Sequence, residues 1–93
     1  MAYEPAKNVK IQQDIYKSKI IEAYKTLGLS LYNSNVNDAK YRWNDALDVL
    51  KSIENPSVQI KNIIRDIDSL KFFSNMQDAK FSIEKIISNL KNI

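Results

Sequence analysis

The 93-residue chain has no cysteine and no histidine, and it has only one glycine and two prolines. The absence of cysteine excludes disulfide bonds, thiolate metal sites and cysteine nucleophiles. The absence of histidine removes the commonest general base and the commonest metal ligand. So little glycine and proline argues against the many tight turns of an all-β fold. We therefore expect an all-α protein that is not an enzyme and holds neither a cofactor nor a metal ion.

Long apolar runs are lacking as well. No segment approaches the roughly 18 consecutive apolar residues that cross a bilayer, and the start of the chain has no apolar signal core. These features predict a soluble protein without a membrane span, and we expect it in the cytoplasm. The chain is 44% hydrophobic and 27% charged, which is typical of globular proteins, and its length predicts one domain over residues 1–93.

The net charge is a modest excess of basic residues, with 14 basic against 11 acidic side chains and a formal charge of +3. The excess is not concentrated in one segment. Residues 1–25 and 56–93 each carry +2, and residues 26–55 carry −1. A modest basic surface spread over two parts of the chain is only weak evidence for a polyanionic partner such as nucleic acid.

Apolar residues recur at steps of three and four along most of the chain, the spacing of one stripe on a helix. The pattern predicts four helices, at about 6–31, 36–53, 56–73 and 76–91. Polar turns at 32–35 and 74–75 separate them, and Asn55 caps a third helix whose first residue is Pro56. The predicted core residues, in helix order, are Ile20, Ala23, Tyr24, Leu27 and Leu31; Ala39, Trp43, Ala46, Leu47 and Leu50; Ile60, Ile63, Ile64, Ile67 and Leu70; and Ala79, Ile83, Ile86, Ile87 and Leu90.

The sequence also repeats itself at a spacing of 40 residues. The segment 34–40 matches the segment 74–80 at five of seven positions, and the apolar pattern that follows continues in the same register. Good helix capping alone accounts for the short identity, but it explains the extended apolar register less well. The chain is therefore predicted to form two helical hairpins of one design, at about 6–54 and 56–92.

Residues 20–53 resemble a tetratricopeptide repeat. That family places an aromatic residue, a leucine-glycine pair and a bulky residue on its first helix, and alanine, aromatic and alanine on its second. The matching residues here are Tyr24, Leu27, Gly28 and Leu31, followed by Ala39, Trp43 and Ala46. Residues 60–91 keep only Ala79 of this pattern, the turn is one residue shorter, and the repeat is 40 residues long instead of 34.

The resemblance implies a partner surface on the outward side of the first and third helices. Carried onto this sequence, the partner-binding residues are Lys25, Leu29, Tyr32, Arg65, Ser69 and Phe72. In a closed four-helix bundle the same side chains would instead pack against neighbouring loops. Because two stacked hairpins leave an apolar end uncovered, the four helices either close into a bundle or pair with another chain as a homodimer.

The acidic residues do not predict a catalytic or metal-binding site. Five aspartates fall between the apolar positions, so we predict that they lie on solvated helix faces: Asp38, Asp45, Asp48, Asp66 and Asp68. A carboxylate metal site in a helical bundle would also need inward-facing glutamates and histidines.

Taken together, these features predict an interaction module that binds a protein partner, as a peptide or a helix, and has no chemistry of its own. One alternative is a helical nucleic-acid-binding protein that uses the basic residues of the first and third helices: Lys7, Lys10, Lys17, Lys19, Lys25, Lys61, Arg65 and Lys71. Another is a small four-helix immunity or inhibitor protein. Nucleic-acid binding would weaken steeply with salt, whereas apolar groove binding would not.

Overall fold

A computed structural model describes the backbone of residues 5–93 and the side chains of residues 14–93. Residues 1–4 of the predicted domain, and the side chains of Lys7 and Lys10, lie outside the described part. The described chain contains four α-helices and no strand: α1 Pro5–Ser30, α2 Val36–Lys51, α3 Val58–Ser69 and α4 Met76–Lys91. A short 3₁₀ turn, η1 Leu70–Phe72, follows α3 directly. The predicted all-α class and number of helices are confirmed.

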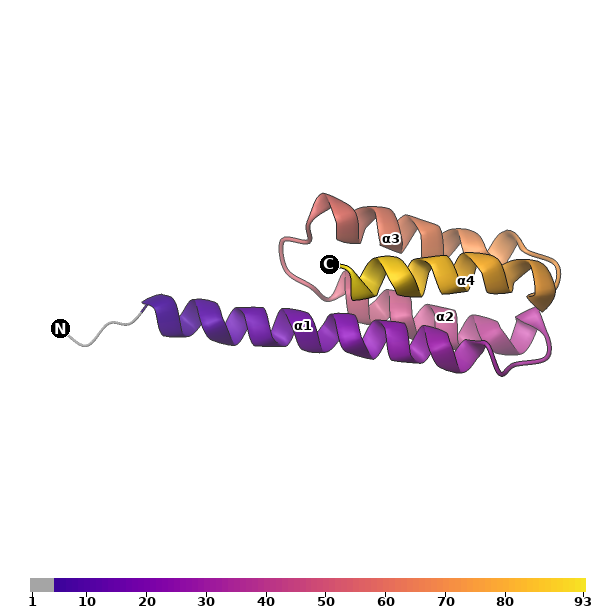
Figure 1. Cartoon of the computed structure of the whole chain (residues 1–93), viewed down its shortest axis with the longest axis horizontal. Helices are drawn as coiled ribbons and strands as arrows, with labels where there is room; N and C mark the ends of the chain where they lie inside the picture. The colour runs from indigo at the N-terminus through magenta and orange to yellow at the C-terminus, as the bar shows by residue number, and fades with distance from the viewer. Residues whose placement is uncertain (1–4) are drawn as a thin grey trace.

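The helices form a closed antiparallel bundle (Figure 1). Each helix packs against two others, in the order α1, α2, α3, α4 and back to α1. As a result α1 and α3 run parallel and lie diagonally across the bundle, as do α2 and α4. A solenoid pair would instead bring α1 against α3. Of the two arrangements that the sequence left open, the structure has the closed bundle.

One hydrophobic core runs through all four helices, and it contains most of the residues predicted for it. Tyr24, Leu31, Ile64 and Ile87 are the exceptions, since they are only partly buried against it. Trp43 is 2% exposed, and its indole Nε1 donates a hydrogen bond of 3.0 Å to Ser30 Oγ. Ser30 is the one polar residue found fully buried among the described side chains. The tryptophan therefore has both an apolar site and a partner for its N–H group.

The starts of α2 and α4 are near copies of each other. The Asn35 side chain accepts a hydrogen bond from the Asp38 amide at 2.9 Å and donates one to Asp38 Oδ2 at 3.0 Å. Asn75 makes the same two contacts with Asp78, at the same distances. Each asparagine satisfies an amide that the first helical turn leaves free, and each aspartate lies at the positive end of the helix. The 40-residue sequence repeat thus corresponds to a repeated local structure.

The predicted start of the third helix is wrong by two residues. Asn55 adopts a left-handed conformation with φ of 51°, which asparagine tolerates better than most residues, and the chain reverses there. The cap is Ser57, whose hydroxyl accepts from the Ile60 amide at 3.2 Å, so α3 begins at Val58. The second helix also ends earlier than predicted, at Lys51 instead of residue 53.

The first helix is the longest element and extends past the ends of the other three (Figure 1). Gly28 lies two residues before its end, and a Cβ atom built there would have nothing within 4 Å. Gly28 therefore does not mark a close approach between two helices. Among the described helices, none has both the length and the apolar character needed to cross a bilayer.

Candidate partner-binding groove

The structure divides the six predicted partner-binding residues into two groups. All six are exposed, with Leu29, Tyr32 and Phe72 at 49%, 88% and 79%. The first group comprises Lys25, Leu29 and Tyr32, at and just beyond the end of α1. The second comprises Arg65, Ser69 and Phe72, along α3 and η1. Because α1 and α3 are diagonal in the bundle, the two groups do not form one continuous surface.

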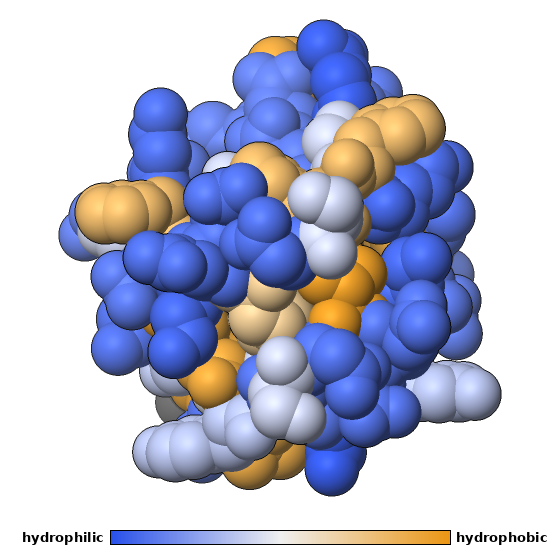
Figure 2. Space-filling view, turned by 90° about the vertical axis from the view of Figure 1, so that its right-hand side faces the viewer, coloured by the Kyte–Doolittle hydropathy of each residue, from blue (hydrophilic) through white to orange (hydrophobic). Residues whose placement is uncertain are grey.

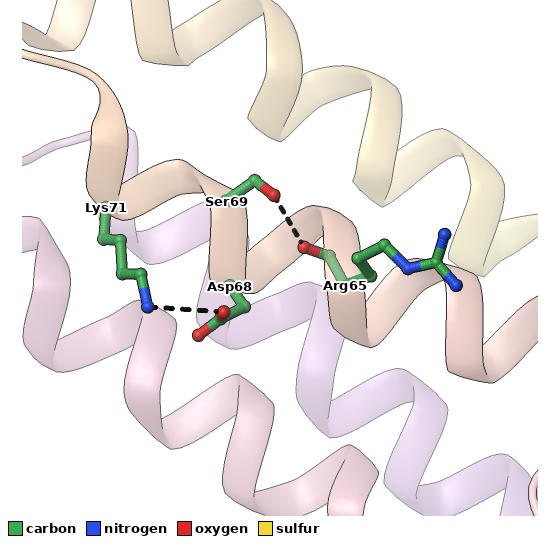
Figure 3. A network of polar contacts seen from close by, with 4 residues as sticks. All are labelled: Arg65, Asp68, Ser69 and Lys71. Carbon is green, nitrogen blue, oxygen red and sulfur yellow. Dashed lines mark hydrogen bonds and ion pairs between the residues drawn. The ribbon is translucent and has the colours of Figure 1, made fainter.

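Local contacts order the α3 group (Figure 3). The Ser69 hydroxyl donates to the Arg65 carbonyl oxygen at 3.0 Å, and Lys71 Nζ lies 3.4 Å from Asp68 Oδ2. The same ammonium group lies 5.3 Å from the centre of the Phe72 ring. The Arg65 guanidinium extends away from the Asp68–Lys71 pair (Figure 3). These contacts are solvent-exposed and contribute little stability, so they orient the surface more than they hold the fold.

A hollow of about 430 Å³ opens beside Ser69 and Phe72, between the end of α3 and the middle and second half of α4. Its apolar lining includes Phe73, which is half-buried, and Ile86, which is 3% exposed. Lys85 contributes to the α4 wall. The predicted α3 residues therefore form one side of a concave surface whose other side comes from α4.

This hollow continues along the same pair of helices. A second hollow of about 260 Å³ shares Asp66 and Asn89 with the first and reaches Ile93 at the end of the chain. Together the two hollows form one groove, which we call the α3–α4 groove. On the α4 side the lining residues run from Ser82 to Ile93, so the groove has the length of about three helical turns.

Side-chain size explains why the groove lies in the second hairpin. In the 40-residue register, Ile63 and Ile86 stand where the first hairpin has Ala23 and Ala46. Both isoleucines line the groove, and both alanines are fully buried. Alanine allows two helix backbones to approach closely, whereas isoleucine holds them apart. Accordingly, α1 and α2 pack together more extensively than α3 and α4 do.

The rims of the groove are polar and carry both signs of charge. Asp66 lies on the α3 side and Lys85 on the α4 side. An apolar floor between polar rims suits an amphipathic segment, whose apolar side chains enter the groove while its polar ones meet the rims. Among the described side chains, no three acidic residues come together in a way that could hold a metal ion. The five predicted aspartates are all exposed.

Sequence reasoning missed the α4 wall of this site. It assigned Ile86 to the core, which is correct, but it did not identify Lys85 or Asn89 as surface partners of α3. Neither residue type is unusual on a helix surface, so neither attracts attention alone. The available signal was the pair of changes from alanine to isoleucine between the two repeats, which implies that the second hairpin is the wider one.

A third hollow, of about 460 Å³, lies at the opposite end of the bundle, where α1 leaves the other helices. Tyr16, Ile53 and Glu54 contribute to it, and Lys19 Nζ donates to the Ser52 carbonyl oxygen at 3.0 Å nearby. It holds none of the six predicted partner-binding residues, and it is a local recess instead of a groove along two helices.

Comparisons of this chain with protein-family models, with curated proteins and with solved structures found no match. The tetratricopeptide resemblance therefore stays a prediction from the sequence pattern.

Proposed function

We propose that this protein is a non-enzymatic interaction module that binds a partner helix or peptide in the α3–α4 groove. The observation that carries the proposal is the groove itself, with an apolar floor at its wide end, mainly polar side chains at its narrow end and along its rims, and a length matching a short helix. Helix-in-groove recognition uses this combination of features. The proposal keeps the α3 half of the predicted surface and adds α4 as its second wall.

The chemistry of the rims specifies the partner further. The wide end of the groove, at Phe72, Phe73 and Ile86, accepts one or two large apolar side chains of the partner. Next to it, Lys85 favours an acidic residue and Asp66 a basic one. The expected partner is therefore an amphipathic helix of three to four turns with apolar residues at steps of three and four.

The proposal can be tested by selecting 16-residue peptides from an amphipathic library against the purified protein and measuring the affinity of an enriched peptide for defined variants. Phe72→Ala should weaken binding by roughly tenfold or more, because exposed aromatic side chains often dominate such interfaces. Tyr32→Ala is the matched control, since Tyr32 occupies the equivalent position in the first hairpin but does not line the groove.

Amide chemical shifts of the labelled protein would show where the peptide lies. We expect the changes to concentrate in residues 59–93 and the affinity to vary little between low and high salt. Loss of binding on Tyr32→Ala with no effect of Phe72→Ala would move the site to α1. If every enriched peptide binds the Phe72→Ala variant as tightly as the wild type, or if no peptide is enriched, the proposal is contradicted.

A further inference from the structure

Each helix of the bundle contributes one exposed aromatic side chain near the same end. We call this the turn end, because it holds the α1–α2 and α3–α4 turns. Tyr32 follows α1, Tyr41 lies in the second turn of α2, Phe72 lies in η1 after α3, and Phe81 lies in the second turn of α4. We call these four residues the aromatic girdle. Their exposures are 88%, 74%, 79% and 82% in that order.

The aromatic girdle obeys the 40-residue repeat, because Tyr32 corresponds to Phe72 and Tyr41 to Phe81. Burial cannot explain these rings, since the packing of the bundle uses other aromatic residues such as Trp43. Figure 2 looks directly at the turn end and shows apolar and pale side chains projecting at its edge, separated by hydrophilic ones. Because each ring comes from a different helix or from the turn that follows it, the four rings are spread around the bundle and do not form one flat patch.

Basic residues adjoin three of the four rings in sequence. Lys40 and Arg42 flank Tyr41, Lys71 precedes Phe72, and Lys80 precedes Phe81. Of the nearby acids, Asp38 and Asp78 hydrogen-bond the capping asparagines and Asp68 pairs with Lys71, the one ion pair among the described side chains, while Asp45 and Glu84 lie one helical turn beyond Tyr41 and Phe81. Lys40, Arg42 and Lys80 have no ion-pair partner among the described side chains, so they can meet a negatively charged partner.

The shape of the turn end argues against two apolar partners. The rings are separated by hydrophilic side chains (Figure 2), whereas the core of a stable dimer interface is apolar and depleted of charged residues. A bilayer would have to cover the polar turns Ser34–Asn35 and Ser74–Asn75, which would desolvate the capping groups. The expected partner is instead a flexible, negatively charged chain whose flat rings can each stack on a different aromatic side chain of the protein.

We infer that the aromatic girdle binds single-stranded nucleic acid, with bases stacked on the rings and phosphates held by the adjacent lysine and arginine side chains. Aromatic platforms interleaved with cations bind single strands in this way without reading their sequence. The surface differs from the basic set predicted on the first and third helices. It also differs from the α3–α4 groove, with which it shares only Phe72.

The test uses the full chain, a fluorescent dT12 oligonucleotide and the duplex of the same length, with anisotropy measured at 50 and 200 mM salt. The key variant is Tyr41→Ala combined with Phe81→Ala. Each base stacked on an aromatic side chain contributes between about fivefold and 150-fold in affinity, so the double variant should bind dT12 at least about 25-fold more weakly. Its duplex affinity should not change, because bases inside a duplex cannot reach the rings.

Two further variants separate stacking from charge. Val58→Ala is the matched control, because Val58 is 72% exposed but lies at the other end of α3, and it should bind dT12 like the wild type. Lys40→Gln combined with Lys80→Gln should reduce the slope of log affinity against log salt by about 1.4, at about 0.7 for each lost phosphate contact.

Equal losses for dT12 and duplex, or no loss on removing the two rings, would overturn the inference. The inference would also be overturned, in favour of a lipid surface, if the wild type binds phosphatidylserine vesicles but not dT12. In that case the same double variant should abolish vesicle binding. Because Tyr41 and Phe81 do not line the α3–α4 groove, the double variant should still bind the selected peptide, and each proposal can fail without the other.

Discussion

The two helical hairpins share one plan and differ in how tightly they close. Their second helices are both 16 residues long and begin with the same capping contacts. In the first hairpin, Ala23 and Ala46 lie at positions where the second has Ile63 and Ile86. The first hairpin also buries Trp43 against Ser30, whereas the corresponding residues of the second are Ile83 and Leu70.

This difference shows how a repeated backbone can divide structural and binding roles between its copies. The closed hairpin encloses its interface with small residues and one buried hydrogen bond. The open hairpin keeps its core but leaves a groove between α3 and α4. A few changes in side-chain volume are sufficient, because interhelical distance depends on the residues at the contact. Four sets of substitutions test the comparison.

The largest effect is expected from Trp43→Ala. Removing this 2% exposed ring leaves a cavity and deprives the buried Ser30 of a partner, at a cost of about 3–5 kcal/mol in the free energy of unfolding. A domain of this size has little more stability than that. Urea unfolding followed by circular dichroism would measure the change, with the exposed Tyr41→Ala as the control. An unfolding curve like that of the wild type would contradict the assigned role of Trp43.

Ala46→Ile gives the first hairpin the residue of the second. Ala46 is fully buried, so the larger side chain should force α1 and α2 apart and cost roughly 1–3 kcal/mol. The reciprocal Ile86→Ala should cost about 2 kcal/mol, toward the low end for such truncations, because the site borders an open groove that can partly collapse. Denaturant midpoints of both variants provide the measurement. Full tolerance of Ala46→Ile would show that small residues do not set the closeness of the first hairpin.

The two caps should behave alike. Asn35→Ala and Asn75→Ala each remove the same pair of contacts, and each should cost about 1 kcal/mol. Asn37→Ala, an exposed change in the first turn of α2, is the control and should be close to neutral. Thermal unfolding of the three variants would provide the comparison. A clear difference between the two cap variants would mean that the hairpins differ in local stability as well as in packing.

The smallest effect is expected from Gly28→Ala, and it should be stabilising. Gly28 is helical, its φ is not positive, and an added Cβ atom would meet nothing within 4 Å. Alanine should therefore add about 0.5–1 kcal/mol through its higher helix propensity. The corresponding rise in melting temperature is a few degrees. A fall in melting temperature would show that the first hairpin needs a glycine there for a reason the packing does not reveal.

Much of the fold follows from local patterns in the sequence. The apolar spacing identified four helices, and α4 begins and ends at the predicted residues because a capping asparagine and the end of the apolar stripe mark its limits. The start of α3 was misplaced because Asn55-Pro56 and Ser57 both offer a plausible cap. Only the backbone conformation of Asn55 decides between them.

The site was harder to predict for a different reason. Exposure of Tyr32 and Phe72 follows from their positions off the apolar stripes, and the structure agrees. The residues that lie next to them cannot be predicted in the same way. A helical pattern indicates which face of a helix is buried, but it does not indicate which other helix packs on that face. The prediction that α1 and α3 share one surface depended on a solenoid arrangement. In the bundle α1 packs against α4 instead, so α1 and α3 lie diagonally and their outward faces are separate.

The sequence by itself therefore determined the helices, their capping and the division of residues between core and surface, since these depend on spacing and local hydrogen bonds. The tertiary structure decided that the bundle closes, that a groove lies between α3 and α4, and that four aromatic side chains surround the turn end. These features depend on contacts between residues far apart in the chain. Such contacts are set by the packing of side-chain volumes in three dimensions, which no local pattern specifies.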